Sequence, residues 1–82
     1  MKISDELYVD ERIYNEDYRE TWIVNEKTGK EIRVAQIFKE GEKWFVWDMY
    51  QGLQQPCKND AVSKYKLIVS VVLDDLRFLL NE

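Results

Sequence analysis

The pattern of apolar and polar positions divides the chain into a strand-rich middle and a helical end. Residues 21–24, 31–38 and 44–50 form three runs rich in β-branched and aromatic side chains, which is typical of strands. Short polar segments containing Gly29 and Gly41 separate the runs, and glycine supplies the positive φ that tight turns require. The sequence therefore predicts a three-stranded antiparallel meander.

The second of these runs shows the alternation of a strand with one buried face. Ile32, Val34 and Phe38 fall on one face, whereas Arg33 and Lys39 fall on the other. We therefore expect the apolar set to contribute to the core of the protein.

The third run is apolar on both of the faces that a strand presents. Trp44 and Val46 point to one side, and Phe45, Trp47 and Met49 point to the other. A sheet with one solvated face shows a cleaner alternation of polar and apolar residues. This strand is therefore either covered on both sides or exposed on one side for a partner.

The C-terminal third repeats apolar side chains at alternating steps of three and four residues, which is the period of an amphipathic helix. This seam consists of Val62, Tyr65, Val69, Val72, Leu76 and Leu79. Other apolar residues beside the seam leave only a narrow polar strip, so the helix must contact something on two sides. We predict a long helix packed on the sheet. The β-branched residues within 65–73 leave open a fourth strand followed by a shorter helix.

The first twenty residues fit either a helix or short strands. A helix would place Ile3, Leu7, Tyr14 and Tyr18 on one face, and the sequence slightly favours it. Two short strand arms around residues 10–11 are the alternative.

Composition limits the chain to one domain with one modest core, since it has 82 residues of which 45% are apolar and 13% aromatic. We predict a single α+β domain over residues 1–82, in which the meander packs against the C-terminal helix beside an acidic N-terminal segment. No apolar run is long enough to span a bilayer, and residues 1–6 have no apolar signal segment. A cytoplasmic protein is expected, and the single cysteine fits a reducing compartment.

Few residues in the chain are suited to catalysis or metal binding. The sequence has no histidine, which excludes Ser-His and Cys-His catalysis and His-ligated metal sites. The glycines are isolated, and the carboxylates lack the spacing of a calcium-binding loop. Cys57 has no second cysteine beside it and is expected to be an incidental thiol. We expect no enzyme activity, no cofactor and no metal site.

The net charge of −4 arises entirely within residues 1–20, which hold seven acidic and three basic residues. Carboxylates spaced along a rigid element can imitate the phosphates of a nucleic acid and cover a basic groove. Tyrosine is enriched at protein interfaces. The predicted partner-binding residues are Asp5, Glu6, Asp10, Glu11, Tyr14, Glu16, Asp17, Tyr18 and Glu20. A solvated acidic face is the alternative interpretation.

These features predict a non-enzymatic inhibitor that binds a host protein and covers its basic, nucleic-acid-binding surface. We expect no direct binding of nucleic acid or membrane. Small size, acidity and abundant aromatic residues are similar to the profile of many phage-encoded inhibitors, such as anti-CRISPR and other anti-defence proteins. The resemblance is one of type and assigns no site residues.

Two other functions are compatible with the sequence. The first is a homodimeric structural or accessory module that pairs through the helical seam at Val62, Tyr65, Val69, Val72, Leu76 and Leu79. The second is single-stranded nucleic-acid binding through Trp44 and Trp47. The acidic net charge argues against the second, because phosphate contacts require positive charge.

Overall fold

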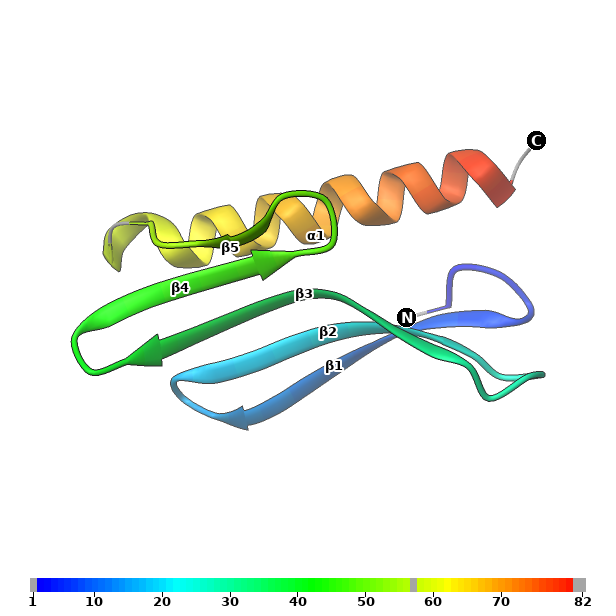
Figure 1. The fold of residues 1–82 in the computed structure, drawn as a ribbon. Helices are drawn as coiled ribbons and strands as arrows, with labels where there is room; N and C mark the ends of the chain where they lie inside the picture. Colours follow the sequence, from blue (N-terminus) through cyan, green and yellow to red (C-terminus); the bar gives the residue numbers. More distant parts are fainter. Residues whose placement is uncertain (1, 57, 81–82) are drawn as a thin grey trace.

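The computed structural model describes residues 2–56 and 58–80, which form a five-stranded antiparallel sheet and one helix in two layers (Figure 1). The elements in chain order are β1 (Leu7–Asn15), β2 (Tyr18–Asn25), β3 (Glu31–Glu40), β4 (Lys43–Asp48), β5 (Gly52–Gln54) and α1 (Lys58–Leu80). The strands pair in sequence order. The predicted α+β class is confirmed, and the sheet has two strands more than the predicted meander.

The predicted meander corresponds to β2, β3 and β4. Its turns form as predicted, since Gly29 and Gly41 adopt positive φ angles of 73° and 63°. The additional strand β5 arises where the chain bends back after Asp48. The Asp48 carboxylate accepts hydrogen bonds from the backbone N–H groups of Tyr50 at 2.8 Å and Gln51 at 2.7 Å. This local turn returns the chain to the edge of β4.

The N-terminal segment is a strand, which corrects the helical prediction. β1 runs for nine residues without a break at residues 10–11, so neither a helix nor two short arms form. It pairs with β2 from Leu7 opposite Asn25 to Asn15 opposite Tyr18. This pairing satisfies the backbone groups on one edge of β1, and it outweighs the weak helical periodicity of the segment.

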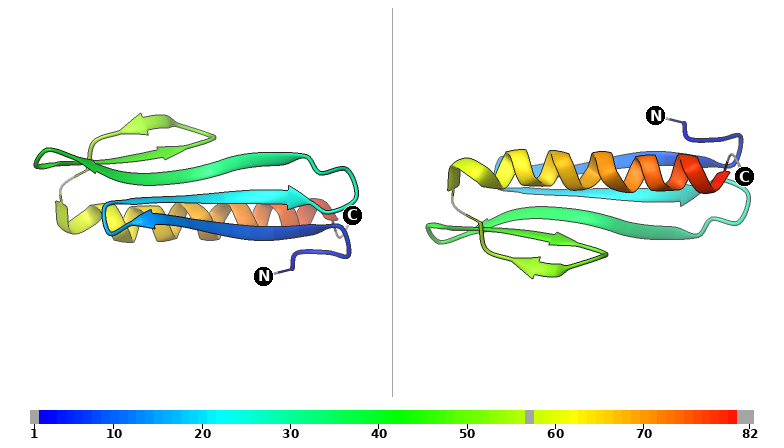
Figure 2. Two further views of the ribbon diagram at one scale, coloured as in Figure 1. Left: turned by 90° about the horizontal axis from the view of Figure 1, so that it is seen from below. Right: turned by 90° about the horizontal axis from the view of Figure 1, so that it is seen from above.

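α1 lies along one face of the sheet, and none of the described elements covers the opposite face (Figure 1). Seen from below in Figure 2, the strands lie in front of the helix and nothing lies in front of the strands. Residues 65–73 are helical, so the alternative of a fourth strand there is wrong. The buried core between the two layers consists of Ile23, Val34, Ala35, Ile37, Val46, Ala61, Tyr65 and Val72.

A β-bulge in β3 changes which side chains face the helix. The pairing of β3 with β2 shifts by one residue at Val34. Val34 and the following Ala35 are both buried, at 1% and 0% exposure. Arg33 and Phe38 therefore lie together on the face away from α1, where both contact aromatic rings. This corrects the predicted grouping of Phe38 with Ile32 and Val34.

The predicted dimer seam is the face by which α1 packs on its own sheet. Tyr65 and Val72 are buried, at 6% and 1% exposure, and the Tyr65 hydroxyl is hydrogen-bonded to Thr21 on β2. Of the other members, Val69 and Leu76 are half-buried, Val62 is exposed, and the side chain of Leu79 lies outside the described residues. The chain therefore uses this seam internally, and a homodimer built on it would have to compete with the sheet.

The packing of α1 predicts unequal effects for one substitution at two positions of the helix. We expect Val72→Ala to lower the free energy of unfolding by about 2 kcal/mol, because it removes two buried methyl groups. Val62→Ala, at a position that is 48% exposed, should change it by less than about 0.5 kcal/mol. Urea unfolding of both variants measures the difference. Equal losses would show that the helix does not pack as described.

Candidate binding face

The sheet face away from α1, called the open face below, carries aromatic rings interleaved with charged groups. Adjacent residues of a strand point to opposite faces, so Trp44 packs towards the core while Phe45 lies on the open face. The side chains that meet on the open face are Asp10, Arg12, Tyr14, Tyr18, Glu20, Trp22, Glu31, Arg33, Gln36, Phe38, Phe45 and Trp47.

Four rings form a row across the first four strands, one ring from each strand. Tyr14 meets Tyr18 edge-on with 5.1 Å between ring centres, and Tyr18 lies 6.1 Å from Phe38. Phe38 stacks on Phe45 at 5.1 Å. These spacings are those of favourable aromatic pairs. Tyr14 is exposed and the other three rings are half-buried, although none of the described elements covers them. This set is called the aromatic row below.

Glu20 lies beside the aromatic row and is only 5% exposed. The hydroxyl of Tyr14 donates to Oε1 at 2.8 Å, and the indole Nε1 of Trp22 donates to the same oxygen at 3.1 Å. Arg33 donates to Oε2 at 3.2 Å, and the hydroxyl of Tyr18 donates to it at 3.3 Å. Because these donors come from β1, β2 and β3, the carboxylate joins three strands from the uncovered side.

Two opposing effects act on the pKa of Glu20. Burial raises the pKa, because it disfavours the charged form of the carboxyl group. Hydrogen bonds from Trp22, Tyr14, Arg33 and Tyr18 lower it by more, so the net pKa lies below the ordinary value. Glu20 is therefore ionised at neutral pH. Its carboxylate in turn raises the pKa of the Tyr14 hydroxyl that donates to it.

Two arginines lie over two tryptophans on the open face. The guanidinium of Arg12 is 4.3 Å from the ring centre of Trp22, and that of Arg33 is 4.4 Å from the ring centre of Trp47. Both guanidiniums also form ion pairs, Arg12 with Asp10 at 2.9 Å and Glu31 at 2.8 Å, and Arg33 with Glu20 at 3.2 Å. The positive charge of the open face is thus neutralised within the chain.

The structure divides the predicted partner-binding residues among several places. Asp10, Tyr14, Tyr18 and Glu20 lie on the open face. Glu16 and Asp17 form the turn between β1 and β2, Glu11 lies on the side of the sheet that faces α1, and Asp5 and Glu6 precede β1. Because the segment is extended, neighbouring carboxylates point to opposite faces. The continuous acidic row that a helix would present is therefore not formed.

Several acidic residues of this segment are moreover paired within the chain. Glu6 contacts Lys27 at 2.9 Å, while Asp10 and Glu20 contact the two arginines of the open face. The negative charge of these carboxylates is partly neutralised within the chain, so they attract a basic partner less strongly than the sequence predicted.

The open face also includes Arg12, Arg33, Phe38 and Phe45, which are outside the predicted partner-binding set, and Trp47, which the sequence suggested only for single-stranded nucleic acid. One signal in the sequence did point towards them, since the third predicted strand is apolar on both sides. The structure shows that its second side, with Phe45 and Trp47, is not covered by any described element.

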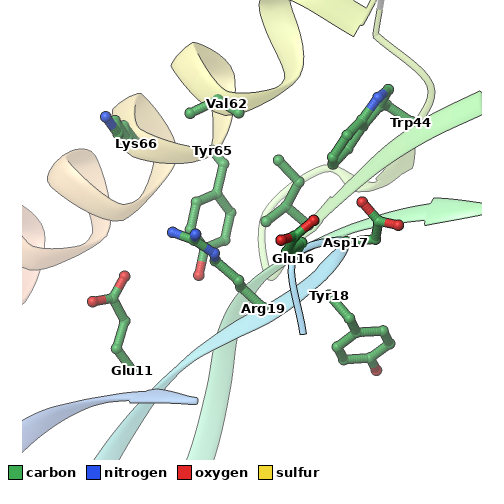
Figure 3. Close-up of a pocket in the computed structure, with 10 residues that line it drawn as sticks. Glu11, Glu16, Asp17, Tyr18, Arg19, Trp44, Val62, Tyr65 and Lys66 are labelled. Atoms are coloured by element: carbon green, nitrogen blue, oxygen red, sulfur yellow. The ribbon is translucent and has the colours of Figure 1, made fainter. Parts of the chain in front are cut away.

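A hollow of about 180 Å³ lies on the other side of the sheet, between α1 and the β1–β2 turn (Figure 3). Glu11 and Arg19 extend from the sheet towards the helix, where Tyr65 and Lys66 lie, whereas the ring of Tyr18 points away from them. Charges of both signs line the hollow. No group of three metal-ligating side chains occurs in the described part of the chain, and Cys57 lies outside it.

Comparisons with protein-family models, with curated proteins and with solved structures each found no match. No helix formed by the described residues is long and apolar enough to cross a bilayer. The geometry of the open face is therefore the basis on which a function is proposed.

The lowered pKa of Glu20 predicts a pH-dependent contribution to stability. A carboxyl group whose pKa is lower in the folded than in the unfolded state stabilises the fold above the unfolded pKa. This contribution to stability is lost as the pH falls through the pKa that the carboxyl group has in the folded state. We expect Glu20→Gln to destabilise the protein at neutral pH, and the difference from the wild type to shrink as the pH falls below about 4.3.

Urea unfolding of both proteins across this pH range measures the effect. Glu42→Gln is the control, because Glu42 is exposed and has no hydrogen bond or ion pair among the described residues. A constant difference between wild type and Glu20→Gln at all pH values would show that the Glu20 carboxylate is not held by these donors.

Proposed function

We propose that the chain is a non-enzymatic protein-binding module and that the open face of its sheet binds the partner. The observation that carries this proposal is an ordered layer of aromatic rings and arginines that none of the described elements covers. A small domain ordinarily places large aromatic residues in its own core. Tyrosine, tryptophan, phenylalanine and arginine are the residues that protein interfaces concentrate at their centres.

The size of the open face suits a protein partner. β1, β2 and β3 have nine, eight and ten residues, which at roughly 3.3 Å per residue give a length of roughly 30 Å. The five strands, at roughly 4.8 Å spacing, give a width of roughly 20 Å. The projected area of roughly 600 Å² approaches the roughly 800 Å² that each partner contributes to a standard interface.

The order of the open face also favours binding. The rings and guanidiniums are already held by Glu20 and by one another, so a partner would immobilise few additional side chains. Side chains that are ordered before binding lose less conformational entropy when the complex forms. The open face therefore has the rigidity expected of a preorganised interface.

Nucleic acid is a less suitable ligand for the same face. Stacking of bases on aromatic rings is accompanied by positive charge that contacts the phosphates. Here Arg12 and Arg33 are both paired with carboxylates, and the chain carries a net charge of −4. The composition of the open face thus supports a protein partner.

The edges of the sheet are less suitable than its face. The edge of β1 is bridged by Lys2 at Tyr8, and its pairing with β2 shifts between Ile13 and Asn15. At the opposite edge, β5 has only three residues. Short strands and bulges are ways in which proteins protect a sheet against pairing with a further strand. These features support binding through side chains of the face.

Binding through a rigid face covers the partner's surface without any chemical step. This is the mode of action of the inhibitor predicted from the sequence. Inhibition and a phage origin stay predictions, and binding by the open face is the part that the geometry supports.

The proposal predicts that loss of a central ring strongly weakens binding. We expect Phe45→Ser to weaken the affinity for the partner by about thirtyfold or more, as truncation of a central aromatic residue does. Leu53 lies on the open face opposite Trp47, and Leu67 lies on the helix, with exposures of 59% and 65%. Leu53→Ser should therefore weaken binding, whereas Leu67→Ser should not.

The measurement is a quantitative pull-down from nuclease-treated cell lysate with the wild type and the three variants, followed by titration of the purified partner. A protein retained by wild type and Leu67→Ser, and lost with Phe45→Ser and Leu53→Ser, would support the proposal. Binding that is lost only with Leu67→Ser would contradict it. Recovery of only a second copy of the chain would replace the proposal by self-association.

A further inference from the structure

The rings of the open face differ in whether a cation lies over them. Trp22 and Trp47 each have an arginine of the chain within 4.4 Å of the ring centre. No such contact is formed by Tyr18, Phe38 or Phe45 with any described residue. The aromatic row therefore has three half-buried rings that pack on one another and over which no cation of the described residues lies.

The aromatic row lies next to the end of the sheet that carries both the β1–β2 and the β3–β4 turns, on the left in Figure 1. The backbone N–H of Lys39 donates to the carbonyl of Asp17 at 2.9 Å, which holds the first turn against β3. Exposed carboxylates concentrate here, and none of them has an ion pair among the described residues. They are Glu16, Asp17, Glu40 and Glu42. These residues are called the acidic end below.

The acidic end has one carboxylate in excess over the basic residues of the turns and their flanks. Arg19, Lys39 and Lys43 are the basic residues of the turns and their flanks, against four carboxylates, and Arg19 lines the hollow on the α1 side together with Glu16 and Asp17. At the opposite end of the sheet, Glu6 is paired with Lys27 at 2.9 Å. The molecule thus presents unpaired negative charge beside the part of the open face where the rings lack a cation.

We infer that the partner presents an arginine- or lysine-bearing segment that lies across the aromatic row at the acidic end. This inference rests on the proposed function and specifies the chemistry of the partner. The cations of the segment lie against the parts of Tyr18, Phe38 and Phe45 that the neighbouring rings leave uncovered, and they supply there the positive charge that Arg12 and Arg33 supply to the two tryptophans. The carboxylates of the acidic end neutralise the remaining positive charge and attract the segment from solution.

This chemistry identifies a class of partner. Proteins that bind nucleic acid display clusters of arginine and lysine on the surface that contacts the phosphates. A chain that covers such a cluster would exclude the nucleic acid. The acidic, tyrosine-containing surface predicted from the sequence is thereby replaced by a site with two parts, the aromatic row and the acidic end.

The test uses a short peptide of alternating arginine and glycine as the probe, and the ¹⁵N-labelled full chain as the receptor. In about 0.1 M salt, we expect the backbone amide signals of Tyr18, Phe38 and Phe45 to shift with increasing peptide. The same peptide with citrulline in place of arginine should leave them unchanged, because citrulline keeps the shape of arginine and lacks its charge. Equal shifts with both peptides, or shifts confined to α1, would overturn the inference.

Matched charge variants separate the acidic end from the net charge of the protein. We expect Glu16→Gln combined with Glu42→Gln to weaken peptide binding about fivefold. Asp5→Asn combined with Glu26→Gln removes the same charge at the other end of the sheet, beyond the screening length of about 10 Å. This control should weaken binding less than about twofold. Equal weakening by both pairs would show non-specific attraction and would overturn the inference.

Two combinations of outcomes separate failure of this inference from failure of the proposed function. If Phe45→Ser abolishes capture of the partner while the arginine peptide produces no shifts at the aromatic row, the open face binds a partner of different chemistry. The inference is then wrong and the proposed function holds. If the arginine peptide binds at the row but Phe45→Ser leaves capture unchanged, the proposed function fails and the partner does not use this site.

Discussion

One helix has to support a five-stranded sheet in the described part of the chain, and it covers only one face of that sheet. On the covered face the protein buries small and medium apolar side chains such as Val34, Val46 and Val72. The uncovered face cannot consist of apolar side chains alone, because a broad apolar surface left in water is unfavourable. The composition of the open face follows from this constraint.

The open face is ordered by polar groups instead of by a second layer. Burying the Glu20 carboxylate among aromatic rings costs free energy of desolvation, which its four hydrogen bonds offset. Arg12 and Arg33 cover parts of two tryptophan rings while their charges are held by carboxylates. The rings are thus fixed without being enclosed. A surface of this kind remains available to a partner, and it needs little rearrangement to bind one.

Part of this architecture is predictable from the sequence, because it depends on local signals. β-branched and aromatic runs, two turn glycines and a repeat of three and four residues predict β2, β3, β4 and the long helix. β1 gives no such signal, since its centre carries Asp10, Glu11 and Arg12, and it becomes a strand by pairing with β2. The bulge at Val34 likewise appears only when the strands are paired.

The binding face was less predictable than the fold. Glu20 receives hydrogen bonds from residues six positions before it and thirteen positions after it, and no periodicity in the sequence relates them. The sequence therefore marked the acidic residues of this region and two of the rings, Tyr14 and Tyr18, but not Trp22 or the arginines beside them. The one local indication in the sequence was strand β4, whose apolar residues on both sides predicted that the second face of the sheet is either covered or exposed for a partner.

The three tryptophans allow the central claim, that the open face is the binding surface, to be tested in one spectrum. Trp22 and Trp47 lie on the open face, whereas Trp44 packs against the core on the side of the helix. We expect saturation of the ¹⁵N-labelled chain with its purified partner to shift the indole N–H signals of Trp22 and Trp47 and to leave that of Trp44 in place. A shift of Trp44 with Trp22 and Trp47 unchanged would show that the partner binds elsewhere.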